Sequence, residues 1–142
     1  MFGFEMSILK YVEGLRSEWL NGLVELITML GEEMLLVVLI VILWFAFDKK
    51  AAQRLAFGVL ASLGVNSVLK NLVQLPRPFA SGEVTCVRPE TATGYSFPSG
   101  HTQNFAAWGT LVAAQLKRRW VSIVAAALIL LVGLSRIYLG AH

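Results

Sequence analysis

The stretch MLLVVLIVILWFAFDKK, residues 34 to 50, decides the fold class of this 142-residue chain. Residues 34 to 47 are an unbroken apolar run, and the weaker apolar stretch from 23 to 30 extends it toward the N-terminus. At a rise of about 1.5 Å per residue, such a helix can cross a bilayer core of roughly 30 Å. We therefore expect residues 23 to 47 to form a first membrane span.

Three further apolar segments follow this span. In the second segment Gly58 and Ser62 lie four residues apart, which offers a small-residue face for close helix packing. Pro76 and Pro78 exclude helix farther on, so a polar, irregular connection is expected over residues 71 to 97. The four expected spans cover residues 23–47, 51–69, 98–116 and 120–134. The sequence thus predicts an all-α, polytopic transmembrane helical bundle that forms a single domain over residues 1–142.

The first 20 residues have a different pattern. Ile8, Val12, Leu15 and Trp19 fall on one helical face, and charged residues occupy the others. This favours a helix over residues 1–20 that lies in the membrane interface. A cap packed over the bundle is an equally open alternative. Acidic residues among the apolar ones, and the lack of a small-residue cleavage site, argue against a cleaved signal peptide.

Composition excludes several classes of protein. Hydrophobic residues make up 56% of the chain and charged residues 15%, far from the average of soluble proteins. The net charge is +3, but half of the twelve Lys and Arg residues sit in two short clusters, which argues against nucleic-acid binding. Cys86 is the single cysteine, so no disulfide can form within the chain and no cysteine-based metal site is possible.

Charge also predicts the topology. The loops 48–54 and 117–119 carry six Lys and Arg residues against one acid, so the positive-inside rule places them in the cytoplasm. The other span ends then face outward. Those ends hold five residues of chemical interest: Lys70, Arg77, His101, Arg136 and His142. They include both histidines of the chain and three cations for which the positive-inside rule gives no reason.

These residues suit phosphoryl transfer through a histidine. Pro98 and Ser99 introduce a helix, and the N–H groups of a helix N-terminus bind anions. Arg136 and His142 would converge if the helix breaks near Gly140. Cations can then clamp phosphate oxygens while one histidine attacks and another donates a proton. Single residues keep plainer readings, because a lysine at a span end can be an interfacial anchor and Ser99 an ordinary helix cap.

Three spacings carry a resemblance to a known family. They are Lys70-x6-Arg77-Pro78, then Pro98-Ser99-Gly100-His101, then Ser135-Arg136-x5-His142. In this order they resemble the three signature motifs of the type 2 phosphatidic acid phosphatase (PAP2) family, which is related to vanadium haloperoxidases. The similarity runs from about the first span to the last residue.

The resemblance implies a role for each matched position. The substrate phosphate would be held by Lys70, Arg77, Ser99, Gly100 and Arg136. His142 would attack phosphorus and become phosphohistidine, while His101 would protonate the leaving group and later activate water. The scheme requires no metal and no other cofactor, because the cations balance the phosphate charge.

The sequence departs from the family at its end. In the family an aspartate follows the third-motif histidine by four residues, where it orients the imidazole, and here the chain stops at His142. We expect that the natural protein continues with at least one more helix. We also expect the 142-residue chain alone to have little or no activity.

The expected substrate is a lipid phosphate in the membrane bilayer. Phosphatidate, phosphatidylglycerol phosphate and polyprenyl diphosphate all suit a site near the headgroups, and the sequence does not choose among them. The expected location is a bacterial plasma membrane, with the active site on the outer face. A vanadate-type haloperoxidase and a non-catalytic membrane protein or transporter component remain as alternatives, and the oligomeric state stays open.

Overall fold

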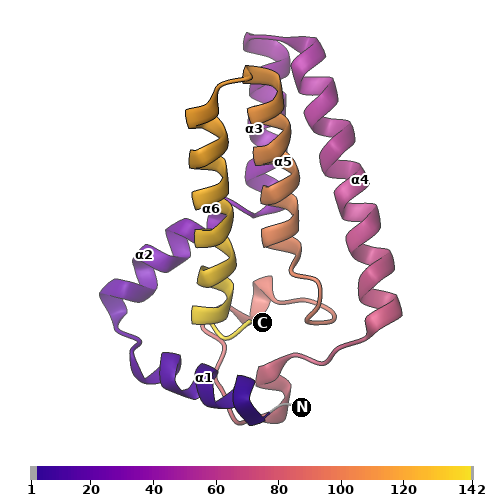
Figure 1. Cartoon of the computed structure of the whole chain (residues 1–142). Helices are drawn as coiled ribbons and strands as arrows, with labels where there is room; N and C mark the ends of the chain where they lie inside the picture. The colour runs from indigo at the N-terminus through magenta and orange to yellow at the C-terminus, as the bar shows by residue number, and fades with distance from the viewer. Residues whose placement is uncertain (1–2, 142) are drawn as a thin grey trace.

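The computed structural model describes residues 3 to 141 of the chain (Figure 1). The α-helices are α1 (Gly3–Gly14), α2 (Glu18–Met29), α3 (Glu33–Ala46), α4 (Lys49–Val73), α5 (Gly100–Leu116) and α6 (Arg119–Tyr138). Two 3-10 helices, η1 (Pro78–Ser81) and η2 (Pro89–Thr91), lie in the connection between α4 and α5. No β-strand occurs in the described part of the chain, which confirms the all-α prediction.

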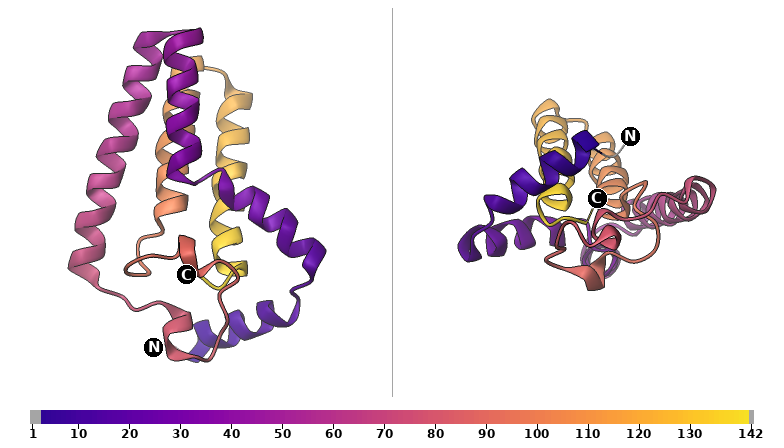
Figure 2. Two further views of the ribbon diagram at one scale, coloured as in Figure 1. Left: turned by 180° about the vertical axis from the view of Figure 1, so that it is seen from behind. Right: turned by 90° about the horizontal axis from the view of Figure 1, so that it is seen from below.

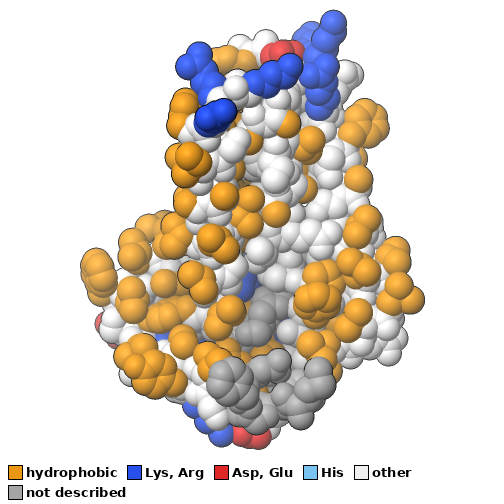
Figure 3. Space-filling view, in the orientation of Figure 1, with side chains coloured by type: hydrophobic (Ala, Val, Ile, Leu, Met, Phe, Trp, Pro, Cys, Tyr) orange, Lys and Arg blue, Asp and Glu red, His pale blue; other side chains and the backbone are white. Residues whose placement is uncertain are grey.

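Four helices stand side by side and two lie at one end of them. Helix α5 packs on α6 and α4, and α3 packs on α4 (Figures 1 and 2). The α3–α4 and α5–α6 turns lie together at the top of Figure 1, where Figure 3 shows Lys and Arg side chains gathered. Helix α1, the long α4–α5 connection and the C-terminal end of α6 occupy the opposite end.

The bundle exposes large apolar side chains and buries several polar ones among the apolar residues of its core. Phe45, Phe57 and Ile123 are 82%, 73% and 69% exposed, whereas Asn104 and Arg136 are each 1% exposed. Large apolar side chains on the outer surface are stable when lipid replaces water as the solvent. The distribution of side chains therefore agrees with an integral membrane protein.

Helix length sets how many elements can cross a bilayer. By length and composition, α4 and α6 are each sufficient, and α2 and α3 together are sufficient although they are bent by 49°. Helix α5 has 17 residues. At a rise of about 1.5 Å per residue it is slightly short for a full span.

The prediction of one helix over residues 1–20 is wrong within the described residues. Helix α1 ends at Gly14, and α2 begins after Ser17, whose hydroxyl accepts a hydrogen bond from Leu20 N–H at 3.3 Å. A serine at this position satisfies one of the free N–H groups of a new helix. Trp19 therefore belongs to α2, while residues 1 and 2 lie outside the described part of the chain.

The prediction of one helix over residues 23–47 is also wrong. The apolar segment is broken between Met29 and Glu33, and Glu32 has the extended backbone of an N-cap. Gly31 lies in the break against the backbone of His101. A tertiary contact that only a glycine can make therefore interrupts a stretch whose composition favours continuous helix.

The other helices differ from prediction at their ends. Helix α4 continues to Val73, and Gln74 ends it in the left-handed conformation with φ of 49°. Helix α5 begins at Gly100, two residues later than predicted. Helix α6 continues to Tyr138, so Arg136 lies within its last turn and does not end it.

The corner between α1 and α2 is fastened to the end of α6. Arg16 Nε donates to Tyr138 O at 2.9 Å, and Arg16 Nη1 donates to Thr85 O at 2.8 Å. Lys10 pairs with Glu83 at 2.7 Å. These contacts hold α1 across the end of the bundle that carries the long connection.

Asp48 offers a test of how α4 begins. Its Oδ1 accepts hydrogen bonds from Lys50 N–H at 2.8 Å and from Ala51 N–H at 3.2 Å. We expect Asp48→Ala to lower the free energy of unfolding by about 1 kcal/mol, because the helix loses its N-cap. Unfolding in mixed micelles measures this change, and Asp48→Asn, which keeps an acceptor, is the control. Equal losses in both variants would show that charge, and not capping, matters there.

Candidate active site

Three helix ends and one connecting segment enclose the candidate site. Lys70 lies in the last turn of α4, His101 in the first turn of α5 and Arg136 in the last turn of α6. The α4–α5 connection closes over them, since Ser96 N–H donates to Leu75 O at 2.8 Å and Val87 N–H donates to Leu139 O at 3.0 Å. Residues distant in the sequence are therefore brought to one end of the bundle.

Arg77 ties the connection to the C-terminal segment. Its Nε donates to Gly94 O at 2.9 Å, its Nη2 to Thr93 O at 2.7 Å and its Nη1 to Ala141 O at 2.6 Å. The side chain is buried, and burial lowers the pKa of the guanidinium below its usual value. Much of the hydrogen-bonding capacity of Arg77 thus holds the walls of the site in place.

Arg136 is a buried cation at the centre of the site. Its Nη1 donates to Thr91 Oγ1 at 3.1 Å and its Nη2 to Thr91 O at 3.4 Å. Its Nε is buried and has no hydrogen-bond partner among residues 3–141. A buried donor without a partner is costly, so this nitrogen is a candidate contact for an anionic ligand.

His101 is held by close backbone packing. A Cβ atom added at Gly31 would lie 2.5 Å from His101 O and 2.9 Å from His101 Cβ, so the α2–α3 break directly contacts the first turn of α5. His101 Nε2 is buried and, within the described chain, has no hydrogen-bond partner. Like Arg136 Nε, this nitrogen is available to a ligand.

The start of α5 presents free backbone donors. The first hydrogen bond of the helix runs from Gln103 N–H to Ser99 O at 3.0 Å. The N–H groups of Gly100, His101 and Thr102 come before it and therefore have no acceptor within the helix. Ser99 makes no side-chain cap, and its Oγ accepts from Thr102 Oγ1 at 3.1 Å. The plain capping role of Ser99 is therefore wrong, while the anion-binding geometry is present.

Positive charge is concentrated around the His101 ring. Lys70, Arg77, Arg88 and Arg136 all lie within electrostatic range of it. Arg88 is ion-paired with Glu32 and Glu90, at 2.8 and 3.1 Å. By contrast, Lys70 and Arg136 have no salt bridge to any described residue. Two cations that form no salt bridge within the described chain, at a partly buried site, favour an anionic ligand.

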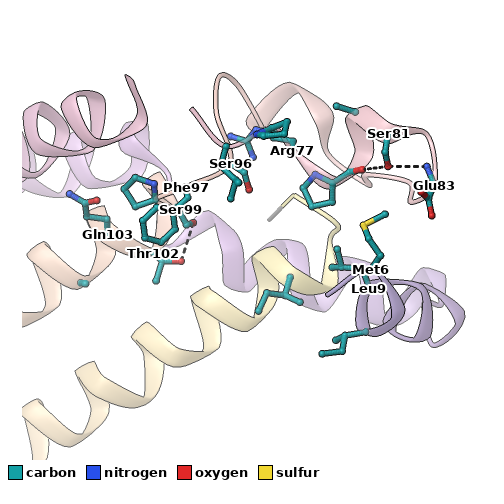
Figure 4. Close-up of a pocket in the computed structure, with 18 residues that line it drawn as sticks. Met6, Leu9, Arg77, Ser81, Glu83, Ser96, Phe97, Ser99, Thr102 and Gln103 are labelled. Carbon is teal, nitrogen blue, oxygen red and sulfur yellow. Dashed lines mark hydrogen bonds between the residues drawn. The ribbon is translucent and has the colours of Figure 1, made fainter. Parts of the chain in front are cut away.

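A cavity of about 1020 Å³ lies beside the site and has Arg77 in its wall (Figure 4). Arg77 and Ser99 are among its polar lining residues, and Met6, Leu9 and Phe97 are among its apolar ones. Helix α1 forms one wall, and the first turns of α5 form another. The cavity thus joins phosphate-compatible groups to an apolar space.

The structure gathers most of the predicted site residues. The residues brought to this end of the bundle are Lys70, Arg77, Ser99, Gly100, His101 and Arg136. Helix α6 ends at Tyr138 and Gly140 has a φ of 72°, so the chain has the break near Gly140 on which the convergence of Arg136 and His142 was made conditional. His142, the predicted nucleophile, lies outside the described residues.

The residues that support the site residues through direct contacts were not identified from the sequence. Thr91 contacts Arg136, Gly31 contacts His101, and Arg88 pairs with Glu32. Burial alone would lower the pKa of Arg88, but its hydrogen bonds to Glu90 and Glu32 outweigh burial and raise that pKa. The one available signal was the Gly-Glu-Glu sequence inside an apolar run, which marks a break.

Fold and site together define an all-α bundle with an apolar outer surface and a cluster of cations at one end. The PAP2 superfamily profile matches residues 51–142, and this chain belongs to that superfamily. The resemblance drawn from the three spacings is thereby confirmed at the level of the family.

Two named relatives and one solved structure are similar to the chain. Phosphatidylglycerophosphatase B of Bacillus subtilis (strain 168) is 34% identical over 143 residues, covering 90% of this chain and 66% of the relative. Undecaprenyl-diphosphatase of Sulfolobus acidocaldarius is 26% identical over 141 residues, covering 99% and 68%. The crystal structure of a transmembrane PAP2 type phosphatidylglycerolphosphate phosphatase from Bacillus subtilis matches with a TM-score of 0.83 at 30% identity, covering 96% and 71%. The chain therefore spans about two thirds of the length of these proteins.

Gly31 provides a test of the packing behind His101. We expect Gly31→Ala to displace the first turn of α5, because the added Cβ would lie 2.5 Å from a backbone oxygen. With two histidines in the sequence, ¹⁵N-histidine NMR of a protein without a histidine tag should show a shifted His101 signal. Gly22→Ala is the matched control, since no atom lies within 4 Å of its added Cβ. An unshifted signal in the Gly31 variant would contradict the close contact.

Proposed function

We propose that this protein is a lipid phosphatase that removes a phosphate from a membrane lipid through a phosphohistidine intermediate. The observations that carry the proposal are the buried nitrogens of His101 and Arg136, which have no partner in the described chain, and an apolar cavity that reaches the site at Arg77 and Ser99. A phosphate group supplies negative charge that can accept hydrogen bonds from the buried nitrogens, and a lipid tail suits the apolar cavity.

The reaction would divide into two displacements. His142 attacks phosphorus, the bond to the lipid oxygen breaks, and His101 gives its proton to that oxygen. His101 then takes a proton from water, which attacks the phosphohistidine and releases inorganic phosphate. Charge that develops on the phosphate oxygens is stabilised by the predicted binding residues: Lys70, Arg77, Ser99, Gly100 and Arg136.

The cavity favours a lipid over a soluble phosphate ester. Its walls are mainly apolar, and it reaches the site at Arg77 and Ser99 (Figure 4). A soluble sugar phosphate would leave this space without a matching group. Two substrate classes come from the names of the relatives, a phosphatidylglycerophosphate and a polyprenyl diphosphate. In the second class the leaving group would be a lipid monophosphate.

The orientation in the membrane forms part of the proposal. We infer four crossings, in which bent α2–α3 serves as one and α5 crosses within the bundle beside α4 and α6. The basic turns at 48–54 and 117–119 would face the cytoplasm. The site would then open at the outer face of a bacterial-type plasma membrane.

The two histidines test the chemistry. We expect His101→Ala to lower phosphate release by roughly 10²- to 10⁴-fold, because the general acid and base is lost. His142→Ala should abolish turnover, since no phosphohistidine can form. Release is measured with the natural full-length protein in liposomes that contain phosphatidylglycerophosphate or a polyprenyl diphosphate.

The control for these variants is Arg118→Ala, which removes an exposed cation at the opposite end of the bundle. It should keep the activity of the parent protein. A parallel assay with glycerol phosphate separates lipid from soluble substrates. If both histidine variants retained full activity, a non-catalytic or transport role would replace the enzymatic proposal.

Accessibility labelling tests the orientation. In a Cys86→Ser background, Ser81→Cys should react with a membrane-impermeant maleimide added to intact cells, because Ser81 is exposed beside the site. Arg118→Cys, also exposed, should react only after the cells are opened. The reverse pattern would place the site in the cytoplasm, and labelling of both from outside would rule out the proposed crossings.

A further inference from the structure

One residue holds one whole edge of the Arg136 guanidinium. Nη1 and Nη2 form the end of the planar group, and they donate to Thr91 Oγ1 and Thr91 O at 3.1 and 3.4 Å. A guanidinium has a second bidentate edge, made by Nε and its neighbouring Nη group. In the described chain Nε of Arg136 is buried without a partner. The contact with Thr91 therefore leaves the side edge for an oxyanion.

A second hydrogen bond, to Arg88 O, fixes the orientation of the Thr91 hydroxyl that contacts Arg136. A threonine hydroxyl has one donor and two acceptor lone pairs. Thr91 Oγ1 donates to Arg88 O at 3.0 Å, so its hydrogen points away from the guanidinium. Its lone pairs are consequently left to accept from Arg136 Nη1. A hydrogen bond from a charged donor to an oriented acceptor is stronger than one between neutral groups.

The turn that carries Thr91 is anchored on both sides. Pro89 starts η2, and Ala92 N–H donates to Pro89 O at 3.0 Å, which closes the turn. Arg88, just before the turn, pairs with Glu32 of the α2–α3 break at 2.8 Å. A restraint therefore runs from this break through the turn to Arg136. Because the turn is fixed, it can set the direction of the guanidinium.

We propose that Thr91 is a positioning residue that holds Arg136 so that its Nε edge faces the substrate phosphate. The inference rests on the proposed function and goes beyond it, because Thr91 belongs to none of the three motif spacings. Thr91 does not touch the reacting atoms in this scheme. It acts through Arg136, and its effect should appear in the binding and transfer of the oxyanion, separately from the binding of the lipid tail.

Paired threonine substitutions test the proposal in the natural full-length protein. Thr91→Val removes the hydroxyl and keeps the shape, whereas Thr91→Ser keeps the hydroxyl. Thr93→Val is the matched control, since Thr93 lies two residues along the same connection and accepts from Arg77 with its backbone oxygen. The measurements are kcat and KM for lipid phosphate hydrolysis and the affinity for orthovanadate, from thermal stabilisation in detergent.

We expect Thr91→Val to weaken the affinity for orthovanadate by about tenfold and to lower kcat by about tenfold. This is the factor that corresponds to the loss of one hydrogen bond to a charged group. KM for the lipid should stay within about twofold, since the cavity still binds the tail. Thr91→Ser and Thr93→Val should stay within about twofold of the parent protein in all three quantities. If Thr91→Val does not fold, Thr91→Ala replaces it.

A double-mutant cycle separates positioning from general packing. In an Arg136→Lys background, Thr91→Val should cause less than about a twofold further loss, because the group it positions is already gone. Additive losses, or equal losses in Thr91→Val and Thr91→Ser, would overturn the role of the hydroxyl. A parent protein that neither releases phosphate nor binds orthovanadate would instead overturn the proposed function, and this inference with it.

Discussion

A buried guanidinium near the end of an apolar helix must find hydrogen-bond acceptors, because an unpaired charge in a low-dielectric interior is strongly destabilising. Arg136 is 1% exposed in the last turn of α6, and the same end of the bundle also buries Arg77. Arg77 donates hydrogen bonds to the backbone carbonyls of residues 93, 94 and 141, and Arg136 donates to the hydroxyl and the carbonyl of Thr91. The irregular connection between α4 and α5 is the source of most of these acceptors.

This choice of partners has a chemical consequence. A carboxylate would neutralise a cation, whereas a carbonyl holds it in place and leaves its charge available to a ligand. Arg88 differs in this respect, because its charge is paired with the carboxylates of Glu32 and Glu90. It lies just before η2, the turn that supports the site. The supporting turn thus carries an ion-paired cation, whereas Arg136 has no salt bridge to any residue between 3 and 141. That arrangement suits transient binding of a phosphate better than permanent neutralisation.

The helices expose large apolar side chains, as contact with lipid requires, and bury polar groups among the apolar residues of the core. The buried polar residues are two asparagines, three serines, one threonine and two arginines. The apolar cavity beside the site has Arg77 in its wall, so an apolar space adjoins the cationic end of the bundle. Under the proposed function, a lipid would keep its tail in this apolar space while its headgroup reaches the cations.

The sequence by itself determined the helical class, the two basic turns at one end and the set of polar residues at the other, because apolar run length and charge placement are local properties. Three ordered spacings also indicated the family. The Gly-Glu-Glu sequence at residues 31 to 33 hints at a break in the first apolar segment, but only the tertiary structure shows that the break packs against His101. Likewise, the role of Thr91 depends on a turn that folds back onto α6 from 45 residues away. Contacts between residues so far apart in the sequence depend on how the helices pack, and local sequence preferences do not determine them.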